Sequence, residues 1–273
     1  RCGARARSAQ RTPRPAATLR PALQGLPLVR FEARRLTGPR PRSGETVLAV
    51  EAVGKHLLVR FSGGLTLETH LRMTGSWHLY RTGERWRKPA HLVRCLVEVP
   101  GRVAVCFSAP VVRTFPTAAG GTSADPLAHL GPDLAAPLPD GLEALPADVV
   151  TACVRRMDEV STPDRAIGDV LLDQRVGNGI GNVYRSEVCW ACRVAPSRPL
   201  AEVDEATRAE LVVTAARLLR ANLGRPGRTT VPGGLAAYGR RGRPCPRCGT
   251  AIRSGTAAEG ARVVYWCPTC QPR

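Results

Sequence analysis

Four cysteines near the carboxyl end of the sequence form its strongest chemical pattern. Their spacing is C-x2-C-x18-C-x2-C, and they are Cys245, Cys248, Cys267 and Cys270. Two Cys-x-x-Cys turns can place four thiolates tetrahedrally around one ion, so the spacing predicts a closed structural Zn²⁺ site. The apolar run 261–266 between the turns is typical of a strand and predicts a hairpin held by the metal. Two disulfides are the alternative, which the lack of a secretory signal disfavours.

Lysine is rare in this arginine-rich sequence, and one of its two lysines lies in a strand-like context. Lys55 stands in Val-Gly-Lys-His-Leu-Leu-Val, and Lys88 is the other. A primary amine can lose a proton and act as a general acid or base, which a guanidinium does poorly. Lys55 is therefore a candidate catalytic residue, with a solvated strand lysine as the alternative interpretation.

The tetrapeptide Gly-Ile-Gly-Asn at residues 179–182 lies between two helical segments. Gly179 and Gly181 permit a tight turn and a close approach of the backbone. A helix that begins at Asn182 would offer free N–H groups and the positive end of its dipole to an anion. These residues predict a phosphate site, and a plain tight connection between helices is the alternative.

Three further residues are suited to contact with nucleic acid. Met73 follows Arg72 in the segment His-Leu-Arg-Met-Thr-Gly, which ends a predicted strand. This methionine could be a wedge that enters the base stack where a nucleotide is flipped out, with a core position as the alternative. Arg262 precedes Cys267 on the predicted hairpin, so bound metal could hold it rigidly against a phosphate.

The elements that must carry these residues begin with a basic segment and a series of strands. Residues 1–22 hold six arginines, three prolines and no acid, which predicts a flexible basic arm or a misread start. Short alternating runs with turn residues between them then predict a β-sandwich or barrel-like domain. The expected strands are residues 26–35, 45–51, 54–61, 65–70, 76–81, 91–99 and 103–107.

Beyond a linker rich in Ala, Gly and Pro, the period becomes helical. The helical runs are residues 149–154, 167–172, 182–193 and, most clearly, 204–222, which Gly224 ends. An α+β multidomain chain is therefore expected. Its parts are an irregular basic arm or misread start at 1–22, a β-sandwich at 23–115, a linker at 116–145, a helical domain at 146–224, a loop at 225–238 and a zinc-ribbon hairpin at 239–273.

The charge balance indicates a polyanionic partner. Lys plus Arg number 40 against 22 acids, which gives a formal net charge of +18 and a pI near 10.8. The excess is spread along the sequence and favours nucleic acid, although a skewed genomic composition would also raise the arginine content. No apolar run reaches the roughly 18 residues of a transmembrane helix, so no membrane partner is expected. The remaining cysteines are scattered through strand-like and helix-like runs, which favours a reduced, cytoplasmic protein that binds zinc. A monomer is expected.

Several motifs occur together and in order. They are Gly-Lys-His-Leu-Leu around Lys55, His-Leu-Arg-Met-Thr-Gly from His70, His-Leu-Gly-Pro-Asp from His129, Leu-Leu-Asp-Gln from Leu171, Gly-Ile-Gly-Asn-Val-Tyr from Gly179 and the four-cysteine ending after Tyr238. In this combination the sequence resembles the formamidopyrimidine-DNA glycosylase and endonuclease VIII family, in particular its actinobacterial endonuclease VIII-like branch. The resemblance covers residues 23–271. It implies a catalytic-type β-sandwich, a helix-two-turn-helix DNA-binding domain and a zinc hairpin, with double-stranded DNA as the partner.

The resemblance also implies an activity, namely base-excision repair by a DNA glycosylase that is also an AP lyase. Lys55 would be the proton donor for β-elimination. Arg262 would be the donor or the phosphate clamp for δ-elimination. The residues expected to contact DNA are Arg72, Met73, His129, Gly179, Gly181 and Asn182.

One departure from the family concerns its nucleophile, which is an N-terminal proline followed by glutamate. The free secondary amine of that proline attacks C1′ of the damaged nucleotide and forms a Schiff base. This sequence begins Arg-Cys-Gly-Ala-Arg, and Pro13 and Pro15 are internal tertiary amides. We expect a missing or misread start, with a catalytically impaired relative that binds damaged or abasic DNA as the alternative.

A second departure concerns the substrate. Residues 108–113 lack the Asp-Pro-Arg-Arg-Phe-Gly pattern of the branch that removes 8-oxoguanine, and the short loop 225–234 offers little to cap a purine. Oxidised pyrimidines are therefore the expected bases. A zinc-ribbon protein that binds RNA or ribosomes would share the charge and the cysteines, and a preference for RNA over lesion DNA would identify it.

Overall fold

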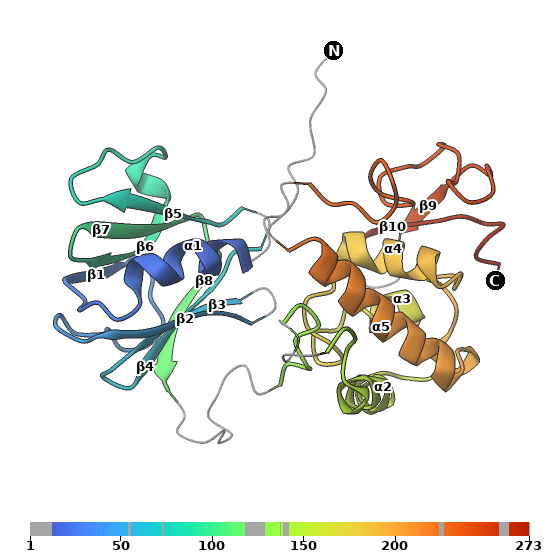
Figure 1. Ribbon diagram of the computed structural model, residues 1–273, viewed down its shortest axis with the longest axis horizontal. Helices are drawn as coiled ribbons and strands as arrows, with labels where there is room; N and C mark the ends of the chain where they lie inside the picture. The colour runs from blue at the N-terminus through green and yellow to red at the C-terminus, as the bar shows by residue number, and fades with distance from the viewer. Residues whose placement is uncertain are drawn as a thin grey trace, which may run out of the picture. The chain divides into compact units, whose positions relative to one another are not determined.

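Figure 1 shows the computed structural model, whose chain divides into two compact units, Arg1–Ala128 and His129–Arg273. The structure describes residues 13–53, 56–72, 74–117, 129–136, 138, 142–223, 227–256 and 262–272. Each unit has its own hydrophobic core, as expected for chain segments of this length.

The first unit is a β-sandwich, as the sequence predicts. One sheet has the strand order β1-β6-β7-β5 and the other has the order β2-β3-β4-β8. All neighbouring strands are antiparallel. The elements are β1 Arg30–Ala33, β2 Val47–Val53, β3 His56–Phe61, β4 Leu65–His70, β5 Ser76–Arg81, the 3-10 helix η1 Ala90–Leu92, β6 Val93–Val99, β7 Arg102–Phe107 and β8 Val111–Pro116.

Strand β8 differs from the sequence expectation, which placed no strand after residue 107. It pairs with β4 over its whole length, from Pro116 opposite Leu65 to Val111 opposite His70. As the last strand of its sheet, β8 can end in a proline, because an edge strand does not need every N–H for pairing. Residues 111–116 therefore form a strand because they pair with β4, which is distant in the sequence.

The core of the sandwich is built from alternate residues of its strands. In β3, Leu57, Val59 and Phe61 are at most 1 % exposed. In β6, Cys95 and Val97 are fully buried in the same cluster. This period of two is the signal that predicts the strands, and the burial of these side chains drives the packing of the sandwich.

Helix α1, Pro13–Leu23, corrects the expectation of an irregular arm over residues 1–22. Ala16, Leu19 and Leu23 lie on one helical face and are at most 3 % exposed in the sandwich core. Packing of this stripe against β2 stabilises the short helix, although the surrounding arginines and prolines conceal the stripe in the sequence. The first part of the expected arm, residues 1–12, lies outside the described residues.

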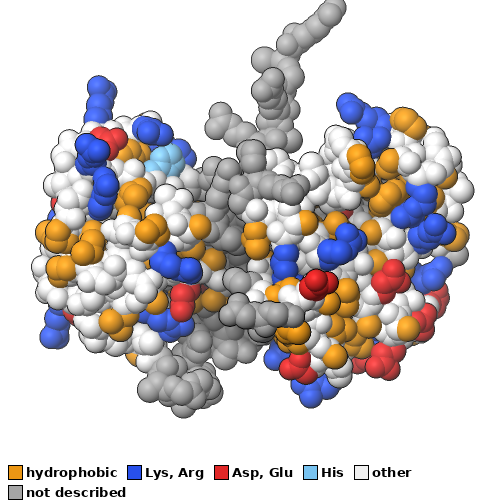
Figure 2. Space-filling view, viewed as in Figure 1, with side chains coloured by type: hydrophobic (Ala, Val, Ile, Leu, Met, Phe, Trp, Pro, Cys, Tyr) orange, Lys and Arg blue, Asp and Glu red, His pale blue; other side chains and the backbone are white. Residues whose placement is uncertain are grey.

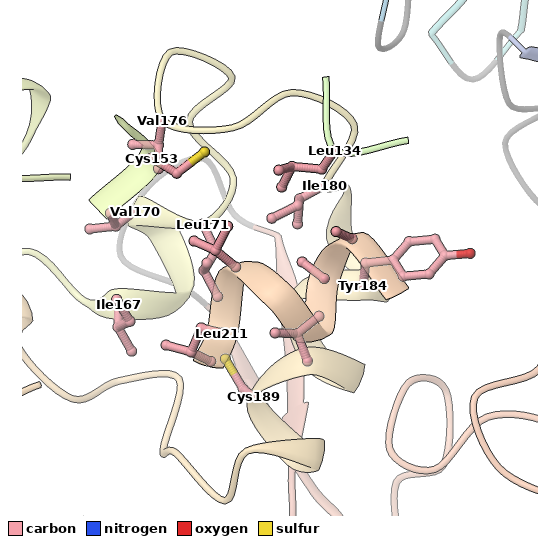
Figure 3. Packing of buried hydrophobic residues seen from close by; sticks show 14 of the residues in the cluster. Leu134, Cys153, Ile167, Val170, Leu171, Val176, Ile180, Tyr184, Cys189 and Leu211 are labelled. Carbon is pink, nitrogen blue, oxygen red and sulfur yellow. The ribbon is translucent and has the colours of Figure 1, made fainter. Parts of the chain in front are cut away.

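The second unit is helical, also as predicted. Its elements are α2 Ala147–Val160, α3 Ile167–Val170, α4 Asn182–Ala191, the 3-10 helix η2 Leu200–Glu202 and α5 Glu205–Ala221. The apolar faces of these helices meet in a core that includes Cys153, Cys189 and Leu211 (Figure 3). Among the helices that the structure describes, none is long and apolar enough to cross a membrane.

Residues 129–136 belong to the helical unit, which corrects the linker expected at 116–145. Leu134 is 1 % exposed within the helical core. The N–H of Gly131 donates to the carbonyl of Gln174 at 2.8 Å. The sequence conceals this role because the segment makes much of its contact through the backbone, which no side-chain pattern reveals.

The last element is a two-stranded antiparallel hairpin of β9, Arg253–Thr256, and β10, Val263–Trp266, as predicted for the cysteine-rich segment. Its small core joins Cys245 and Cys267 to Trp190 of α4. The hairpin is therefore packed on the helical unit and does not fold on hydrophobic contacts of its own.

Candidate nucleic-acid interface and metal centre

The four cysteines predicted to bind metal lie together beside the hairpin. Their sulfur atoms are all within 4.8 Å of one another. The Sγ atoms are 4.0 Å apart in Cys245 and Cys270 and 3.5 Å apart in Cys248 and Cys267. A tetrahedral ion bound by thiolates at about 2.3 Å requires sulfur separations of about 3.8 Å, whereas a disulfide requires about 2.05 Å. The geometry fits a bound metal ion and not the alternative of two disulfides.

The protonation of the thiols agrees with a site for a cation. Hydrogen bonds with Thr250 lower the pKa of Cys248 to about 6. Burial and the neighbouring thiols raise the pKa of Cys270 to about 12. Four thiols this close cannot all ionise without compensating positive charge, and a divalent cation supplies that charge. The cluster can therefore hold a metal ion.

Gln271, which the sequence analysis missed, braces the cluster against the helical unit. Its Oε1 accepts a hydrogen bond from the N–H of Cys267 at 2.8 Å, and its Nε2 donates to the carbonyl of Val194 at 2.8 Å. On the other side, the indole N–H of Trp190 donates to the sulfur of Cys245 at 3.3 Å. These contacts orient the cysteine turns from outside, as the partners of metal ligands commonly do.

The hairpin is hydrogen-bonded to the start of α4, and this contact brings two of the predicted DNA-binding residues together. The Nδ2 of Asn182 donates to the carbonyl of Val263 at 2.9 Å. Arg262, which directly precedes Val263, is exposed. The cap residue of α4 is Gly181, which offers no side-chain hydrogen bond to the start of the helix, and an N-terminus without a side-chain cap is suited to bind an anion.

Arg185, which the sequence analysis also missed, supports this contact from the interior. It is 1 % exposed, and its Nη1 pairs with Asp169 at 2.8 Å. Its Nη2 donates to the side chain of Asn182 and, at 3.3 Å, to the carbonyl of Arg262. Burial lowers the pKa of Arg185, and the attraction of Asp169 opposes this effect. The signal in the sequence was an arginine within a buried helical run.

The turn before α4 has the geometry that its glycines predict. Gly179 has a φ of +107°, which residues with a Cβ rarely adopt. Gln174 holds the turn, because its Oε1 accepts from the N–H of Gly179 at 3.2 Å and its Nε2 donates to the carbonyl of Ile180 at 3.0 Å. A Cβ on Gly131 would lie 2.5 Å from the carbonyl of Val176, so the brace formed by residues 129–136 also requires a glycine.

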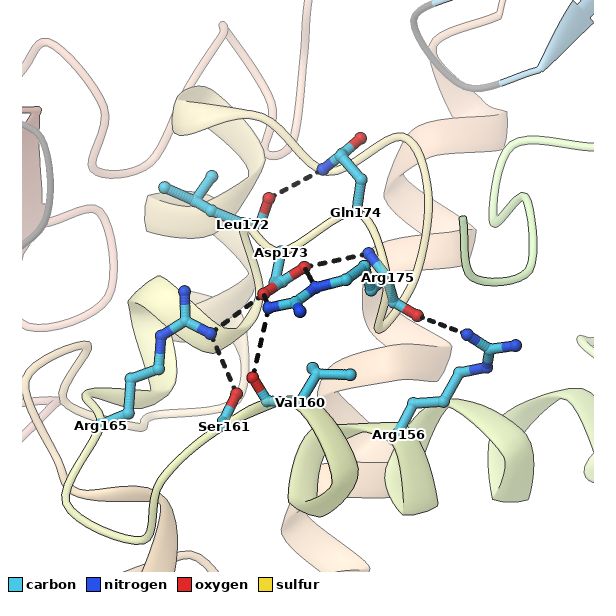
Figure 4. A network of polar contacts seen from close by, with 8 residues as sticks. All are labelled: Arg156, Val160, Ser161, Arg165, Leu172, Asp173, Gln174 and Arg175. Atoms are coloured by element: carbon cyan, nitrogen blue, oxygen red, sulfur yellow. Dashed lines mark hydrogen bonds and ion pairs between the residues drawn. The ribbon is translucent and has the colours of Figure 1, made fainter. Parts of the chain in front are cut away.

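A network of charged side chains precedes this turn (Figure 4). Asp173 pairs with Arg165 at 3.1 Å and with Arg175 at 2.6 Å. Burial alone would raise the pKa of Asp173, but hydrogen bonds from Arg175 and Arg165 outweigh burial and lower this pKa to about 2. The Nη1 of Arg156 on α2 donates to the carbonyl of Arg175 at 3.1 Å. The network therefore anchors the turn to α2.

Glu187 is fully buried on α4 and holds the loop that leads to the cysteines. Its carboxylate accepts hydrogen bonds from the N–H groups of Ala236, Ala237 and Tyr238 at 2.7 to 2.9 Å. It also accepts from the hydroxyl of Thr230. An acid inside an apolar helix was the signal for this role, and the sequence did not show its partners.

In the first unit, Arg72 lies in a tight turn directly after β4. It is exposed, with a φ of 46°. The N–H of Gly75 donates to the carbonyl of Leu71 at 2.8 Å and closes the turn. A positive φ is strained for a residue with a Cβ, and the closed turn maintains it. Met73, the predicted wedge in the same turn, lies outside the described residues.

Lys55 also lies outside the described residues, but β3, which follows it, begins in a buried charge cluster that the sequence analysis missed. Glu68 is 1 % exposed, lies 2.7 Å from the Nδ1 of His56 and accepts a hydrogen bond from the Nε of Arg113. Burial would raise the pKa of Glu68, but the hydrogen bonds with His56 and Arg113 outweigh burial and lower it. The ring of His56 stacks on His70 with centroids 4.5 Å apart.

The predicted DNA-binding residues are therefore only partly brought together. Asn182 and Arg262 meet through the α4–hairpin contact, and Gly179 and Gly181 shape the turn beside it. His129 is exposed in the same unit and forms no hydrogen bond or ion pair with the residues that the structure describes. A single phosphate suits the α4 terminus, because the helix dipole and the guanidinium of Arg262 both favour negative charge.

Two sequence families match the chain. Residues 16–113 match the formamidopyrimidine-DNA glycosylase N-terminal domain, and residues 141–231 match the formamidopyrimidine-DNA glycosylase H2TH domain. The probable endonuclease 8 2 of Streptomyces coelicolor is 43% identical over 84% of this chain and 80% of its own length. The DNA-(apurinic or apyrimidinic site) lyase Nei2 of Mycolicibacterium smegmatis is 36% identical over 94% of this chain and 95% of its own length.

Solved structures show the same fold. The MutM (Fpg) protein of Thermus thermophilus aligns with a TM-score of 0.73 and 27% identity, covering 96% of this chain and 98% of that protein. The Lactococcus lactis formamidopyrimidine-DNA glycosylase, bound to DNA containing an AP site, aligns with a TM-score of 0.75 and 20% identity, covering 97% and 100%. The order of sandwich, helical domain and terminal hairpin is therefore similar to that of these proteins.

Proposed function

Since the chain belongs to the formamidopyrimidine-DNA glycosylase and endonuclease 8 family, we propose that it is a base-excision-repair DNA glycosylase with AP lyase activity. Its substrate would be double-stranded DNA that contains oxidised bases or abasic sites. The name DNA-(apurinic or apyrimidinic site) lyase of one relative supports the lyase activity, and the name formamidopyrimidine-DNA glycosylase of another supports the glycosylase activity. The net charge of +18 supports a polyanionic substrate.

The anion site at the start of α4 is the observation that carries this proposal. An uncapped helix terminus is equivalent to about half a positive charge, and Arg262 adds a full one. Contacts to phosphate hold DNA in position without reading its sequence, which suits an enzyme that must find damage anywhere. The side chain of Asn182 already bonds to Val263 and Arg185, so its backbone N–H is the group most readily offered to a phosphate.

The proposed chemistry divides between two cationic residues of different type. Lys55 would donate the proton in β-elimination, because a primary amine can be both protonated and neutral near pH 7 when its pKa is lowered. Arg262 keeps its charge at all working pH values, so it would stabilise the phosphate that leaves in δ-elimination. Both roles rest on the positions of these residues in the family motifs.

We further infer that the metal is Zn²⁺, because four thiolates in tetrahedral geometry are a typical zinc donor set. Cys245, Cys248, Cys267 and Cys270 would hold it. The ion would stabilise the cysteine turns that flank β9 and β10, and through them the position of Arg262. Its contribution is structural, since four protein ligands leave no open coordination position for a substrate.

Oxidised pyrimidines are the proposed bases. Arg113, in the segment that lacks the 8-oxoguanine-branch pattern, donates to the buried Glu68 and is engaged within the sandwich. The loop after α5 is short and is closed on itself, because the N–H of Thr230 donates to the carbonyl of Gly234 at 2.8 Å. Such a loop offers little surface to cover a flipped purine.

Borohydride trapping tests the activity. The protein is incubated with duplexes that carry an abasic site, thymine glycol or 8-oxoguanine, and covalent adducts are separated under denaturing conditions. From a chain that carries the family's N-terminal Pro-Glu, we expect adducts with the abasic site and thymine glycol, slower adduct formation with 8-oxoguanine, and none with undamaged duplex. A faster reaction with 8-oxoguanine than with thymine glycol would contradict the proposed base preference.

A parallel arm addresses the nucleophile. Because the family uses an N-terminal proline followed by glutamate, a version of the chain with Pro-Glu ahead of α1 is tested with the same duplexes. The absence of an adduct from both versions would refute the proposed activity. Binding of abasic duplex by both versions, with an adduct only from the second, would favour a chain that binds damaged DNA without processing it.

A further inference from the structure

Strand β5 ends in a basic loop that none of the roles above uses. The β5 basic patch is defined here as Arg81, Arg85, Arg87, Lys88 and Arg102. Within residues 81–90, four cations stand against one acid, Glu84. We propose that the β5 basic patch is a second contact surface for the phosphate backbone of DNA, additional to the α4 site. On the face seen in Figure 2, Lys and Arg side chains gather over the end of the first unit that carries this loop.

The one acid of the loop does not neutralise its cations. The Oε2 of Glu84 accepts a hydrogen bond from the backbone N–H of Arg81 at 2.9 Å. Arg81 lies directly opposite Arg102 in the register of β5 and β7. Like charges directly opposite each other destabilise a sheet, so this pair reduces stability in the free protein. An anionic partner would remove that repulsion.

Some other arginines of the same unit are paired with acids. Arg30 pairs with Glu98 at 2.7 Å, and Arg60 pairs with Glu51 at 2.8 Å. The side chains of Arg85 and Arg87 are exposed, and within the described part of the chain neither forms an ion pair. Their donors are therefore available to a ligand from solution.

The loop is anchored, so these arginines are presented on a fixed backbone. The Nζ of Lys88 donates to the hydroxyl of Ser76 at 2.8 Å and lies 5.8 Å from the centre of the Phe107 ring. Trp86 packs edge-on against the same ring, with centroids 6.3 Å apart. Because the loop is already ordered, binding a ligand there loses less conformational entropy than binding to a mobile loop.

The loop also concentrates positive potential. Residues 84–90 line a cavity of about 550 Å³. Burial lowers the pKa of the neighbouring His78, and the charges of Lys88 and Arg87 lower it further. Three of the lining residues are cations and one, Glu84, is an acid. A concave surface with an excess of charge of one sign focuses the electrostatic field and raises the local concentration of counter-charged ligands. The cavity and its cations therefore favour an anion.

A phosphate backbone fits this surface better than an acidic peptide. A guanidinium binds a phosphate through two parallel hydrogen bonds, and repeated phosphates match several arginines at once. Peptide recognition usually adds an apolar groove for side-chain anchors, whereas Trp86 is half-buried against Phe107. The inference rests on DNA being the partner in the proposed function, but it does not depend on catalysis.

The test measures how the affinity for undamaged duplex DNA depends on salt, using fluorescence anisotropy of a labelled duplex with the full chain. Each phosphate contact contributes about −0.9 to the slope of log K against log salt concentration. The double variant Arg85→Gln/Arg87→Gln should bind more weakly and should have a slope shallower by about 1.8. The matched control is Arg30→Gln/Arg60→Gln, which removes the same charge from paired positions and should change the slope much less.

The outcomes separate the possibilities. An unchanged slope in the patch variant, or an equal change in the control, would overturn the proposal, because net charge alone would explain the data. If poly-glutamate binds at the patch and the affinity for duplex DNA stays unchanged, the proposal is overturned in favour of an acidic peptide. The duplex carries no lesion, so this result does not depend on whether the borohydride trap succeeds. Trapping of abasic DNA by the patch variant shows in turn that the proposed activity is intact.

Discussion

Replacing Arg185 with methionine tests how far the phosphate site depends on one buried cation. The substitution keeps an unbranched apolar stem and removes the guanidinium with its charge. It leaves Asp169, which is 5 % exposed, without the partner that lies at 2.8 Å. It also removes the donor to the carbonyl groups of Arg262 and Val263 at 3.3 Å. The contact between α4 and β10 should therefore loosen.

The magnitude follows from the burial of the pair. Removing one partner of a buried ion pair costs about 3–5 kcal/mol, because the remaining charge stays buried without compensation. This is a large part of the roughly 5–15 kcal/mol that stabilises a typical domain. In the double variant Arg185→Met/Asp169→Leu no charge is left uncompensated, so more than half of the lost stability should return.

Hydrogen exchange of the α4 amides, followed by mass spectrometry, is the appropriate assay. The chain has two units, so a single unfolding free energy for the whole molecule is not well defined, whereas exchange reports the local one. Arg185→Met should raise exchange in residues 182–191 by about two to four orders of magnitude. Arg155→Met, which breaks an exposed pair with Glu159, is the control and should change it by less than about threefold. A small effect of Arg185→Met, or no recovery in the double variant, would refute the reasoning.

Cys267→Ser should release bound zinc and abolish DNA binding, whereas the control Cys192→Ser should retain the metal. The measurement is the metal content per chain, and zinc retained after Cys267→Ser would contradict the four-thiolate site. Arg262→Ala should weaken binding of abasic DNA by about tenfold to a hundredfold and spare zinc, with Arg253→Ala on β9 as the control. Loss of zinc from Arg262→Ala would count against its placement as an exposed residue. The low pKa of Asp173, about 2 against an ordinary 3.8, means that its carboxylate stabilises the fold above about pH 4 and that this contribution is lost as the pH falls through 2. Asp173→Asn should therefore reduce stability by about 1–2 kcal/mol at pH 7 and weaken the acid dependence of unfolding, and an unchanged acid transition by circular dichroism would disprove this.

Features that depend on a few neighbouring residues could be predicted from the sequence. The two Cys-x-x-Cys turns fall close together, and Gly179 has the positive φ expected of a tight turn. The cap of the long helix α5 is Asp204, whose side chain accepts a hydrogen bond from the N–H of Thr207 at 2.8 Å. The geometry of each single turn and of the helix cap is set within about four residues, which is the range of capping bonds and turn geometry. The approach of the two cysteine turns was predicted from the zinc-ligand spacing and is made by the hairpin between them. The roles of Lys55 and Met73 stay predictions.

Features stabilised by distant segments could not be predicted. The sequence predicts an irregular arm in place of helix α1, because its arginines and prolines are local features, whereas the β2 strand that packs against the helix is distant in sequence. Residues 129–136 appeared to be a linker because their contacts with the turn before α4 are largely backbone contacts. In both cases tertiary packing stabilised a segment that has little intrinsic tendency to fold.

The buried charges show the same division most clearly. The sequence shows that Glu68, Arg185 and Glu187 are charged residues in apolar runs. It does not show that Arg185 meets Asp169, or that Glu187 accepts three N–H groups from residues 236–238. A charge is tolerated in the interior only where partners compensate for its lost hydration. The sequence alone therefore determined which chemical groups the protein carries, and the tertiary structure decided which of them are held in place, because only folding supplies their partners.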